Sequence, residues 1–378
     1  MSPRRNLVYC TPVHSSGEKI AVADAPAHGE DLSGRLDVRA GDRLLVLAPH
    51  PDDETLGTGG LLQRVRDRDA TARVVFITSG ERNPWAQRAT ERRLVITRRQ
   101  RAAFGARRER EAVEALRALG VPSEWATFWR FPDQGLTAAL LSSQCDLQGR
   151  LAAELATFRP SVVVFPSPLD LHPDHSALGV TARVLLGGLA IPRQLCYLIH
   201  HPALRQRLGV VPALELGEDQ RTAKVTAIRH HVSQLFWRRR WMEAFANASE
   251  PYCDGRRPPS GADHPITVLS RDGAPLRLAV HLRLLVRAWG PTTLVAVAAR
   301  AGVVTHRVSV PLHRIGRTAL VSDPSTGATL GHARLGPGGA VELPTELLPV
   351  DTSLFLKVER RFGFFDEAGW REVGEGSH

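Results

Sequence analysis

Short apolar runs alternate with longer stretches of helical spacing over the first two thirds of the chain. Three runs are continuous enough to predict buried strands, at Arg43–Ala48, Arg73–Thr78 and Val162–Phe165. Two more stretches are strand-like, Trp125–Arg130 and Gln194–Ile199. Between these runs, apolar positions recur with the period of a helix, in Thr55–Asp67, Arg98–Leu119, Ser143–Phe158 and Ser176–Leu186. The alternation predicts an α/β fold with a Rossmann-like, mostly parallel sheet and helices on both of its faces.

The pattern changes at Glu250–Gly261, a stretch rich in proline and glycine that has the composition of a linker. Beyond it, short apolar stretches separated by turn residues predict strands, at Ile266–Leu269, Leu276–Val286, Thr293–Val297, Val303–Val310, Ala319–Val321, Ala340–Leu343 and Ser353–Val358. We therefore expect a small, sandwich-like all-β domain at the C-terminal end. The expected division is an N-terminal arm at 1–40, an α/β domain at 41–250 and a β-rich domain at 262–378.

The composition argues against a nucleic-acid partner, although the formal net charge is +10. The chain has three lysines, Lys19, Lys224 and Lys357, so its basic character comes from arginine. These arginines are dispersed and many alternate with acidic residues, as in Arg107–Glu111. A nucleic-acid interface would instead gather basic residues on one surface.

The cysteines and the apolar runs indicate a cytoplasmic protein. Cys10, Cys145, Cys196 and Cys253 are far apart in the sequence and predict neither a disulfide framework nor a cysteine zinc site. The first residues carry charge without an apolar stretch and do not predict a signal peptide. No apolar run approaches the roughly 20 residues of a membrane-spanning helix.

Two dense groups of histidine and carboxylate follow predicted buried strands. Ala48–Glu54 (APHPDDE) comes directly after the first strand, and Leu171–His175 (LHPDH) comes shortly after Val162–Phe165. In parallel sheets, ligands bind beyond the carboxyl ends of the strands. The two motifs can therefore meet in one crevice.

The residue types in these motifs suit a hydrolytic zinc site, with another divalent ion as the alternative. Catalytic zinc takes histidine and carboxylate ligands and keeps one position open for water. His50, His175 and one of two aspartates, Asp52 and Asp53, would be enough. Adjacent residues of an extended backbone point in different directions, so one aspartate can bind the metal while the other takes a proton from the water. His172 can stabilise the developing oxyanion or donate a proton.

These two motifs, together with the glycines that follow the first one, resemble the PIG-L/LmbE family of zinc-dependent N-acetylglucosaminyl deacetylases. The resemblance covers roughly residues 42–245. It implies a hydrolase that removes an N-acyl group, most often acetyl, from the amino sugar of a small-molecule glycoside or glycoconjugate. Carried over position by position, it makes His50, Asp53 and His175 the ligands of Zn²⁺.

The resemblance also implies roles for residues beyond the metal ligands. Asp52 falls on the general base, and His172 falls on the group that stabilises the tetrahedral intermediate. Asp174 would orient His172 or His175 from outside the ligand set. Asp133 falls where the family contacts the sugar hydroxyls. Arg108 is a further candidate for substrate binding.

Two more candidates for substrate binding have alternative interpretations. Trp85 lies in the basic stretch Ser79–Thr97, which is either a solvated loop with a helix start or a lid whose tryptophan stacks on a sugar. His231 either lies near the pocket or packs in the core.

Two other functions fit parts of the sequence. One is a zinc amidase that acts on another amide, such as a thiol conjugate. The other is a carbohydrate-binding protein in which the β-rich domain binds the sugar and the core is inactive. All the histidines and aspartates of the two motifs are present, which argues against an inactive core.

Overall fold

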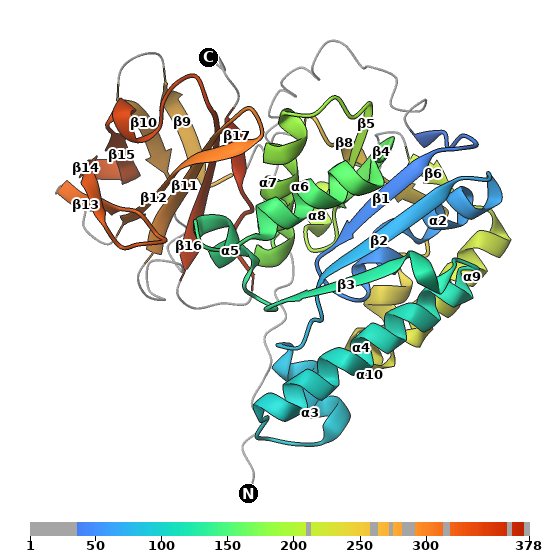
Figure 1. Cartoon of the computed structure of the whole chain (residues 1–378). Coiled ribbons are helices and arrows are strands. Elements are labelled where there is room, and N and C mark those ends of the chain that lie inside the picture. Colours follow the sequence, from blue (N-terminus) through green and yellow to red (C-terminus); the bar gives the residue numbers. More distant parts are fainter. Residues whose placement is uncertain are drawn as a thin grey trace, which may run out of the picture.

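The computed structural model of the chain describes residues 36–208, 213–257, 264–271, 275–281, 292–312, 318–360 and 365–373. The expected N-terminal arm lies outside these residues apart from 36–40, and so does Cys10. The last residues of the strand expected at Leu276–Val286 also lie outside them. The described chain forms two large sheets joined by helices (Figure 1).

The first sheet has six strands in the order β3-β2-β1-β4-β5-β8. Its strands are β1 (Arg43–Ala48), β2 (Thr71–Thr78), β3 (Ala126–Phe131), β4 (Val162–Pro166), β5 (Arg193–Tyr197) and β8 (Cys253–Asp254). The first five strands in chain order are parallel, and β8 pairs antiparallel with β5. This arrangement confirms the Rossmann-like, mostly parallel sheet.

Helices cover both faces of this sheet, which explains why its central strands are continuous apolar runs. The helices are α2 (Asp53–Asp67), α3 (Pro84–Glu91), α4 (Arg98–Ala118), α5 (Leu136–Leu141), α6 (Leu147–Phe158), α7 (Pro173–Gly187), α8 (Pro202–Leu208), α9 (Glu218–His230) and α10 (Val232–Glu243). In β1, Leu44 and Val46 pack with α2, α4 and α9, while Leu45 and Leu47 pack with α5, α6 and α7. Because such a strand is covered on both sides, apolar and polar residues no longer alternate along it with a period of two. No helix in the described ranges has both the length and the apolar character needed to cross a membrane.

The strand order places the two motifs side by side. The chain runs outward from β1 to β2 and β3, then returns to place β4 on the other side of β1. In open α/β sheets, ligands bind in the crevice at such a reversal of strand order. The first motif follows β1 and leads into α2, and the second follows β4 and leads into α7.

The second sheet has nine antiparallel strands in the order β17-β16-β11-β12-β13-β14-β15-β10-β9. Its strands are β9 (Ile266–Ser270), β10 (Leu276–Val280), β11 (Thr292–Arg300), β12 (Val303–Pro311), β13 (Thr318–Ser322), β14 (Thr329–Leu335), β15 (Ala340–Leu343), β16 (Ser353–Arg360) and β17 (Arg371–Val373). The C-terminal part is therefore all-β, as expected. It is a single coiled sheet rather than two stacked ones, because β9 approaches β16 and register shifts such as that at Ala298/Ala299 increase the coiling. A separate two-stranded sheet pairs β6 (Ala213–Glu215) with β7 (Ser249–Pro251).

Helix α7 lies between the two large sheets and joins their cores (Figure 1). Val297 of β11 and Phe355 of β16 belong to the same apolar cluster as Leu178 of α7. Arg183 of α7 forms an ion pair with Glu372 of β17 at 2.5 Å. The two sheets are therefore packed together rather than merely tethered.

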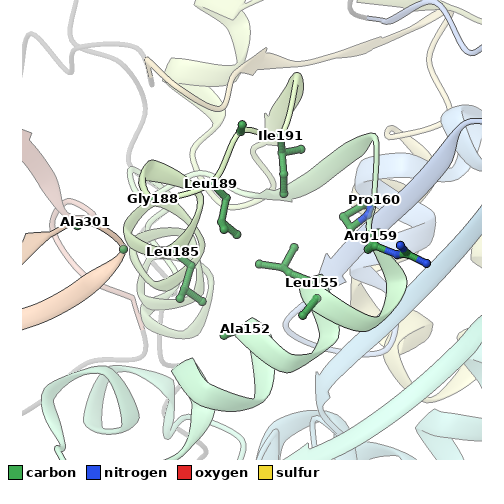
Figure 2. A pocket seen from close by; sticks show the side chains of 12 residues that line it. Ala152, Leu155, Arg159, Pro160, Leu185, Gly188, Leu189, Ile191 and Ala301 are labelled. Atoms are coloured by element: carbon green, nitrogen blue, oxygen red, sulfur yellow. The ribbon is translucent and has the colours of Figure 1, made fainter.

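A pocket of about 420 Å³ also lies at this junction, between α6, α7 and the β11–β12 turn. Figure 2 shows its apolar lining, with Leu155, Leu185 and Ile191 turned inward and Arg159 at its edge. None of its lining residues belongs to the two histidine and aspartate motifs.

A buried ion pair joins α9 to the chain after α10. The Nζ of Lys224 donates to Glu250 Oε1 at 2.5 Å and to the Leu56 carbonyl at 3.0 Å. Glu250 also accepts the Gly60 N–H at 2.5 Å and the Tyr252 hydroxyl at 3.0 Å. A Cβ on Gly60 would lie 2.3 Å from the Leu216 side chain and 3.0 Å from this carboxylate, so glycine lets the helix approach both. Every group of the cluster is paired.

The variant Lys224→Met is expected to lower the free energy of unfolding by about 3–5 kcal/mol, because it leaves the Glu250 carboxylate buried without its cation. The measurement is a urea titration at neutral pH, with the double variant Lys224→Met/Glu250→Gln as the comparison. The double variant should recover part of the loss. A loss below about 1 kcal/mol in the single variant would mean that this pair does not stabilise the fold.

Candidate metal and active site

A small pocket opens at the carboxyl ends of the five parallel strands. Its volume is about 40 Å³, and it is lined by His50, Asp52, Asp53, Leu56, Asn83, Arg108, Asp133, His172, His200, Gln234, Arg238 and Trp241. Loops after β1, β2, β3, β4 and β5 contribute to it, together with α2, α4 and α10. The topology therefore gathers residues that are distant in the sequence, including most of the predicted site residues.

The three predicted metal ligands lie together, with the Asp53 carboxylate close to both histidines. The Oδ2 of Asp53 lies 3.2 Å from His50 Nδ1 and 3.2 Å from His175 Nε2. All three side chains are buried, and neither ring nitrogen of His175 has a hydrogen-bond partner. Ligands held at about 2.1 Å by one tetrahedral cation lie roughly 3.4 Å from one another. These residues therefore fit a divalent cation.

The charges around these ligands also call for a cation. Four buried aspartates, Asp53, Asp133, Asp170 and Asp174, surround the histidines together with the half-buried Asp52. Burial alone would lower the pKa of His50, but hydrogen bonds with the Asp133, Asp174 and Asp53 carboxylates raise it well above its usual value. Buried carboxylates are stable only when a positive charge balances them. A divalent cation would supply that charge.

Asp170, which was not among the predicted site residues, lies against both histidines of the second motif. Its Oδ1 accepts the His172 N–H at 2.9 Å, and its Oδ2 accepts the His200 N–H at 3.1 Å. The same Oδ2 lies 3.5 Å from His175 Nδ1. Burial opposes a charged imidazole, yet Asp53 and Asp170 raise the pKa of His175 to about 9. Asp170 thus holds both histidines of the second motif, and its place two residues before His172 was the available signal.

Asp174 was expected to orient the His172 or His175 ring with its side chain. In the structure, its side chain contacts other groups. Its carboxylate lies 3.2 Å from His50 Nε2 and accepts the backbone N–H groups of Gln134 and Leu136. It reaches His172 through its own backbone N–H, which donates to His172 Nδ1 at 3.2 Å.

Asp52 has the most unusual backbone of the site. Its φ of 138° lies in a region that favours glycine, immediately before α2. Such strain at a pocket residue is typical of functional positions. The Asp52 carboxylate lines the pocket, 3.2 Å from Arg108 Nη2, while Asp53 turns toward the histidines. Burial raises the pKa of Asp52, and the charge of Arg108 opposes the change.

His172 is arranged as a neutral hydrogen-bond donor. It is the N-cap of α7, and its Nδ1 accepts a backbone N–H, so the proton of a neutral ring is on Nε2. Burial, followed by the charges of His50, His175 and His200, lowers the pKa of His172 well below its usual value. A neutral imidazole in the wall of the pocket can donate to an oxyanion.

Arg108 and Asp133 both line the pocket, as residues predicted to bind substrate should. Arg108 donates to the carbonyls of Gly80 at 2.9 Å and Pro51 at 2.7 Å, and thereby ties together the loops after β1 and β2. Asp133 Oδ2 accepts the Arg82 N–H at 2.6 Å, and its Oδ1 lies 3.2 Å from His50 Nε2.

Trp85 and His231 are not among the residues that line this pocket. Trp85 is 62% exposed on α3, a helix that the Thr90 hydroxyl attaches to the Ser233 carbonyl of α10. His231 is buried, with its Nε2 3.2 Å from Thr55 Oγ1 and 3.5 Å from Glu54 Oε1. Glu54 in turn accepts the Asp52 N–H at 3.0 Å, so His231 contacts the first motif through Glu54 and not through the pocket.

Several lining residues lie outside the predicted set. His200 and Trp241 stack with 5.6 Å between ring centroids, and Arg238 lies 4.0 Å from the Trp241 ring. Asn83 donates to Gln234 at 3.1 Å across the pocket. In the sequence, His200 and the aromatic and basic stretch Phe236–Trp241 are more typical of structural packing, and only their position in the fold brings them to the pocket.

Known proteins resemble this chain in the same region. The PIG-L family model, described as GlcNAc-PI de-N-acetylase, matches residues 45–186. The 1D-myo-inositol 2-acetamido-2-deoxy-alpha-D-glucopyranoside deacetylase of Mycobacteroides abscessus is 30% identical over 235 residues, which cover 51% of this chain and 81% of that protein. The deacetylase of the same name from Nocardia farcinica is 34% identical over 149 residues, covering 35% of this chain and 47% of that protein.

Among solved structures, a conserved protein from Thermus thermophilus aligns at 26% identity, with a TM-score of 0.42, over 61% of this chain and 99% of its own. The N,N'-diacetylchitobiose deacetylase from Pyrococcus horikoshii aligns at 20% identity, with a TM-score of 0.41, over 57% of this chain and 84% of its own. The sequence match to the mycobacterial deacetylase covers most of that protein, and both motifs converge on one pocket. The chain therefore belongs to the PIG-L family of de-N-acetylases.

Proposed function

We propose that this protein is a Zn²⁺-dependent hydrolase that removes an N-acetyl group from the amino sugar of a small glycoside or glycoconjugate. The observation that carries the proposal is the arrangement of one pocket. Asp52 lines this pocket but is not one of the three residues, His50, Asp53 and His175, that can share a cation. His172 lines the same pocket. The names of the relatives, which are deacetylases of amino-sugar compounds, support the choice of substrate.

His50, Asp53 and His175 would hold the zinc. Two imidazoles and one carboxylate are a ligand set that zinc hydrolases use, although other divalent ions accept it as well. When bound, zinc would acidify a water molecule and polarise the acyl carbonyl. The two buried ring nitrogens of His175 face the carboxylates of Asp53 and Asp170 without a well-aligned hydrogen bond, which is consistent with this role.

Asp52 is the proposed general base. It takes a proton from the water whose oxygen attacks the acyl carbon, and it later gives that proton to the amine as the carbon–nitrogen bond breaks. Its buried position keeps its pKa higher than that of an exposed aspartate, which favours such two-way transfer. His172 donates from Nε2 to the oxyanion that forms meanwhile. The products are acetate and the free amino sugar.

The remaining residues position this chemistry. We assign Asp133 to a sugar hydroxyl, because it is the carboxylate that the β3 loop brings to the pocket wall. Arg108 holds the Asp52 loop. His231 acts on Asp52 through Glu54. Trp85 would meet only a substrate that extends beyond the pocket.

Acetate release tests the proposal. The zinc-loaded protein would be incubated with N-acetylglucosamine as the free sugar, as an inositol conjugate and as simple alkyl glycosides, with the matching N-benzoyl compounds as controls. We expect stoichiometric acetate and free amine from at least one N-acetyl compound. No acetate from any of them, with zinc shown to be bound, would contradict the substrate class.

The variant His172→Ala is expected to lower kcat for acetate release by about 10²-fold and to change KM less than threefold, because a donor to the oxyanion acts mainly in the transition state. Steady-state kinetics on the best substrate measure both constants. The exposed His332 on β14, changed to alanine, is the matched control. A rise in KM with unchanged kcat would instead make His172 a ground-state contact.

A further inference from the structure

The segment 365–370, which precedes β17, lies directly against the loop that carries His172. The N–H of Asp366 donates to the Leu171 carbonyl at 2.9 Å, one residue before His172. The N–H of Trp370 donates to the Pro168 carbonyl at 2.7 Å. These backbone bonds join two segments about 200 residues apart in the sequence.

The approach is close enough to require glycine in the segment. A Cβ on Gly369 would lie 2.2 Å from the Pro168 carbonyl oxygen and 2.6 Å from the Leu169 carbonyl carbon. Backbone atoms cannot move away as a flexible side chain can. The path of the loop between β4 and α7 therefore depends on the segment beside it.

The nine-stranded sheet holds this segment firmly. Asp366 forms an ion pair at 2.6 Å with Lys357, a fully buried residue of β16. Trp370 is also fully buried, and the Gly369 carbonyl lies 3.0 Å from His264 Nε2. Because these anchors are buried, the segment packs against the sheet along its length.

Phe365 extends this contact to two side chains that line the pocket. Its ring centroid lies 5.8 Å from that of His172, edge to face at 78°, and 5.2 Å from that of His200. Both histidines line the pocket, whereas Phe365 remains 44% exposed at its rim. The His172 ring thus contacts the rings of His50, His175 and His200 and the ring of Phe365.

We propose that the C-terminal sheet is a working part of the active site, in which Phe365 and the 365–370 segment are positioning elements for His172. Only the kinetic test of this inference rests on the proposed function, because it measures acetate release. The Asp170 carboxylate fixes the backbone of the His172 loop by accepting the His172 N–H. The 365–370 segment fixes the same loop by its hydrogen bond to the Leu171 carbonyl, and Phe365 limits the rotation of the imidazole. A donor to an oxyanion must be held within a fraction of an ångström of its position, so loosening this support lowers kcat.

The first test compares Phe365→Ala with Phe365→Leu in the zinc-loaded, full-length protein. We expect Phe365→Ala to lower kcat for acetate release about tenfold, with KM within twofold and bound zinc unchanged. Phe365→Leu should recover at least half of the lost activity because it restores apolar bulk. The matched control is Leu320→Ala, which removes a 55% exposed apolar side chain from β13 of the same sheet.

A change in KM alone would overturn the proposal, because it would make Phe365 a substrate contact. Wild-type kcat in Phe365→Ala would overturn it as well. Gly369→Ala provides a second route: its Cβ displaces the loop, and we expect the same loss of kcat with zinc retained. If Gly369→Ala keeps wild-type kcat, the segment does not position His172.

A spectroscopic readout separates this inference from the proposed function. Nitrogen NMR of the zinc-loaded protein with labelled histidine should show His172 as a single Nε2–H tautomer, and the signals should broaden or shift in Phe365→Ala. If no variant and no wild-type sample releases acetate, the proposed function fails while this signal still decides the inference. Identical His172 signals in wild type and Phe365→Ala would overturn the inference even if acetate is released.

Discussion

Asp52→Asn is expected to lower kcat for acetate release by about 10³-fold or more while zinc remains bound. The substitution keeps the shape of the side chain and removes only its ability to take a proton. Zinc should stay because the three atoms that fit a cation belong to His50, Asp53 and His175. Asp52 lies beside this group, on a backbone whose φ of 138° directs it elsewhere.

The experiment measures kcat and zinc content in the same preparations. Asp69→Asn is a suitable control, because Asp69 is exposed and also has a positive φ, of 54°. It tests whether asparagine at a left-handed position affects the enzyme by itself. If Asp52→Asn loses zinc together with activity, Asp52 is a ligand and the assignment of base and ligand is reversed. If it retains more than a tenth of wild-type kcat, another group is the base.

Asp53→Ala is expected to weaken zinc binding by at least about 10²-fold and to abolish acetate release at equimolar zinc. The reason is geometric, since Asp53 Oδ2 is the atom that lies 3.2 Å from both His50 and His175. Removing it leaves two imidazoles without the carboxylate between them. Supporting residues alone affect metal affinity by 10–100-fold, so the loss of a ligand should exceed that range.

Competition with a fluorescent zinc chelator measures this affinity, and treatment of the wild type with EDTA gives the metal-free reference. Adding zinc back should restore the wild type but not Asp53→Ala. Three other groups of donor atoms lie within 4.8 Å of one another, from His50, His172 and His175, from Asp53, His175 and His200, and from His50, Asp133 and Asp174. The last of these, which lacks Asp53, is the second group that makes the outcome informative. If Asp53→Ala keeps its zinc while Asp133→Ala loses it, the cation occupies that second group.

The packing of both sheets on α7 bears on how these variants should be interpreted. Phe355 and Val297 from the C-terminal sheet share a core with Leu178 and Val180 of the helix that begins beside His172. A destabilising change in the C-terminal part can therefore reach the pocket. Measuring zinc content, or a control variant at an exposed position, separates such an indirect effect from a direct one.

The sequence by itself determined the five parallel strands of the α/β part and the residue types of its two motifs. It did not predict β8, which lies in the stretch 250–261 that was expected to be a linker. The strand at Arg43–Ala48 was predicted with its observed bounds, because a strand covered on both faces must be apolar throughout. Helices α2 and α7 begin earlier than predicted, at Asp53 and Pro173 instead of Thr55 and Ser176. The reason is that the functional residues occupy the first turns, where polar side chains hide the helical period.

Only the tertiary structure decided which groups meet. It placed the Asp174 carboxylate beside His50, revealed Asp170 between His172 and His175, and left Trp85 outside the pocket. It also brought Phe365 to His172 from the far end of the chain. Periodicity reports the direction of a side chain within a regular element. The direction of a side chain in a loop, and the contacts between distant segments, depend on the path of the backbone between those elements, which has no repeating pattern in the sequence.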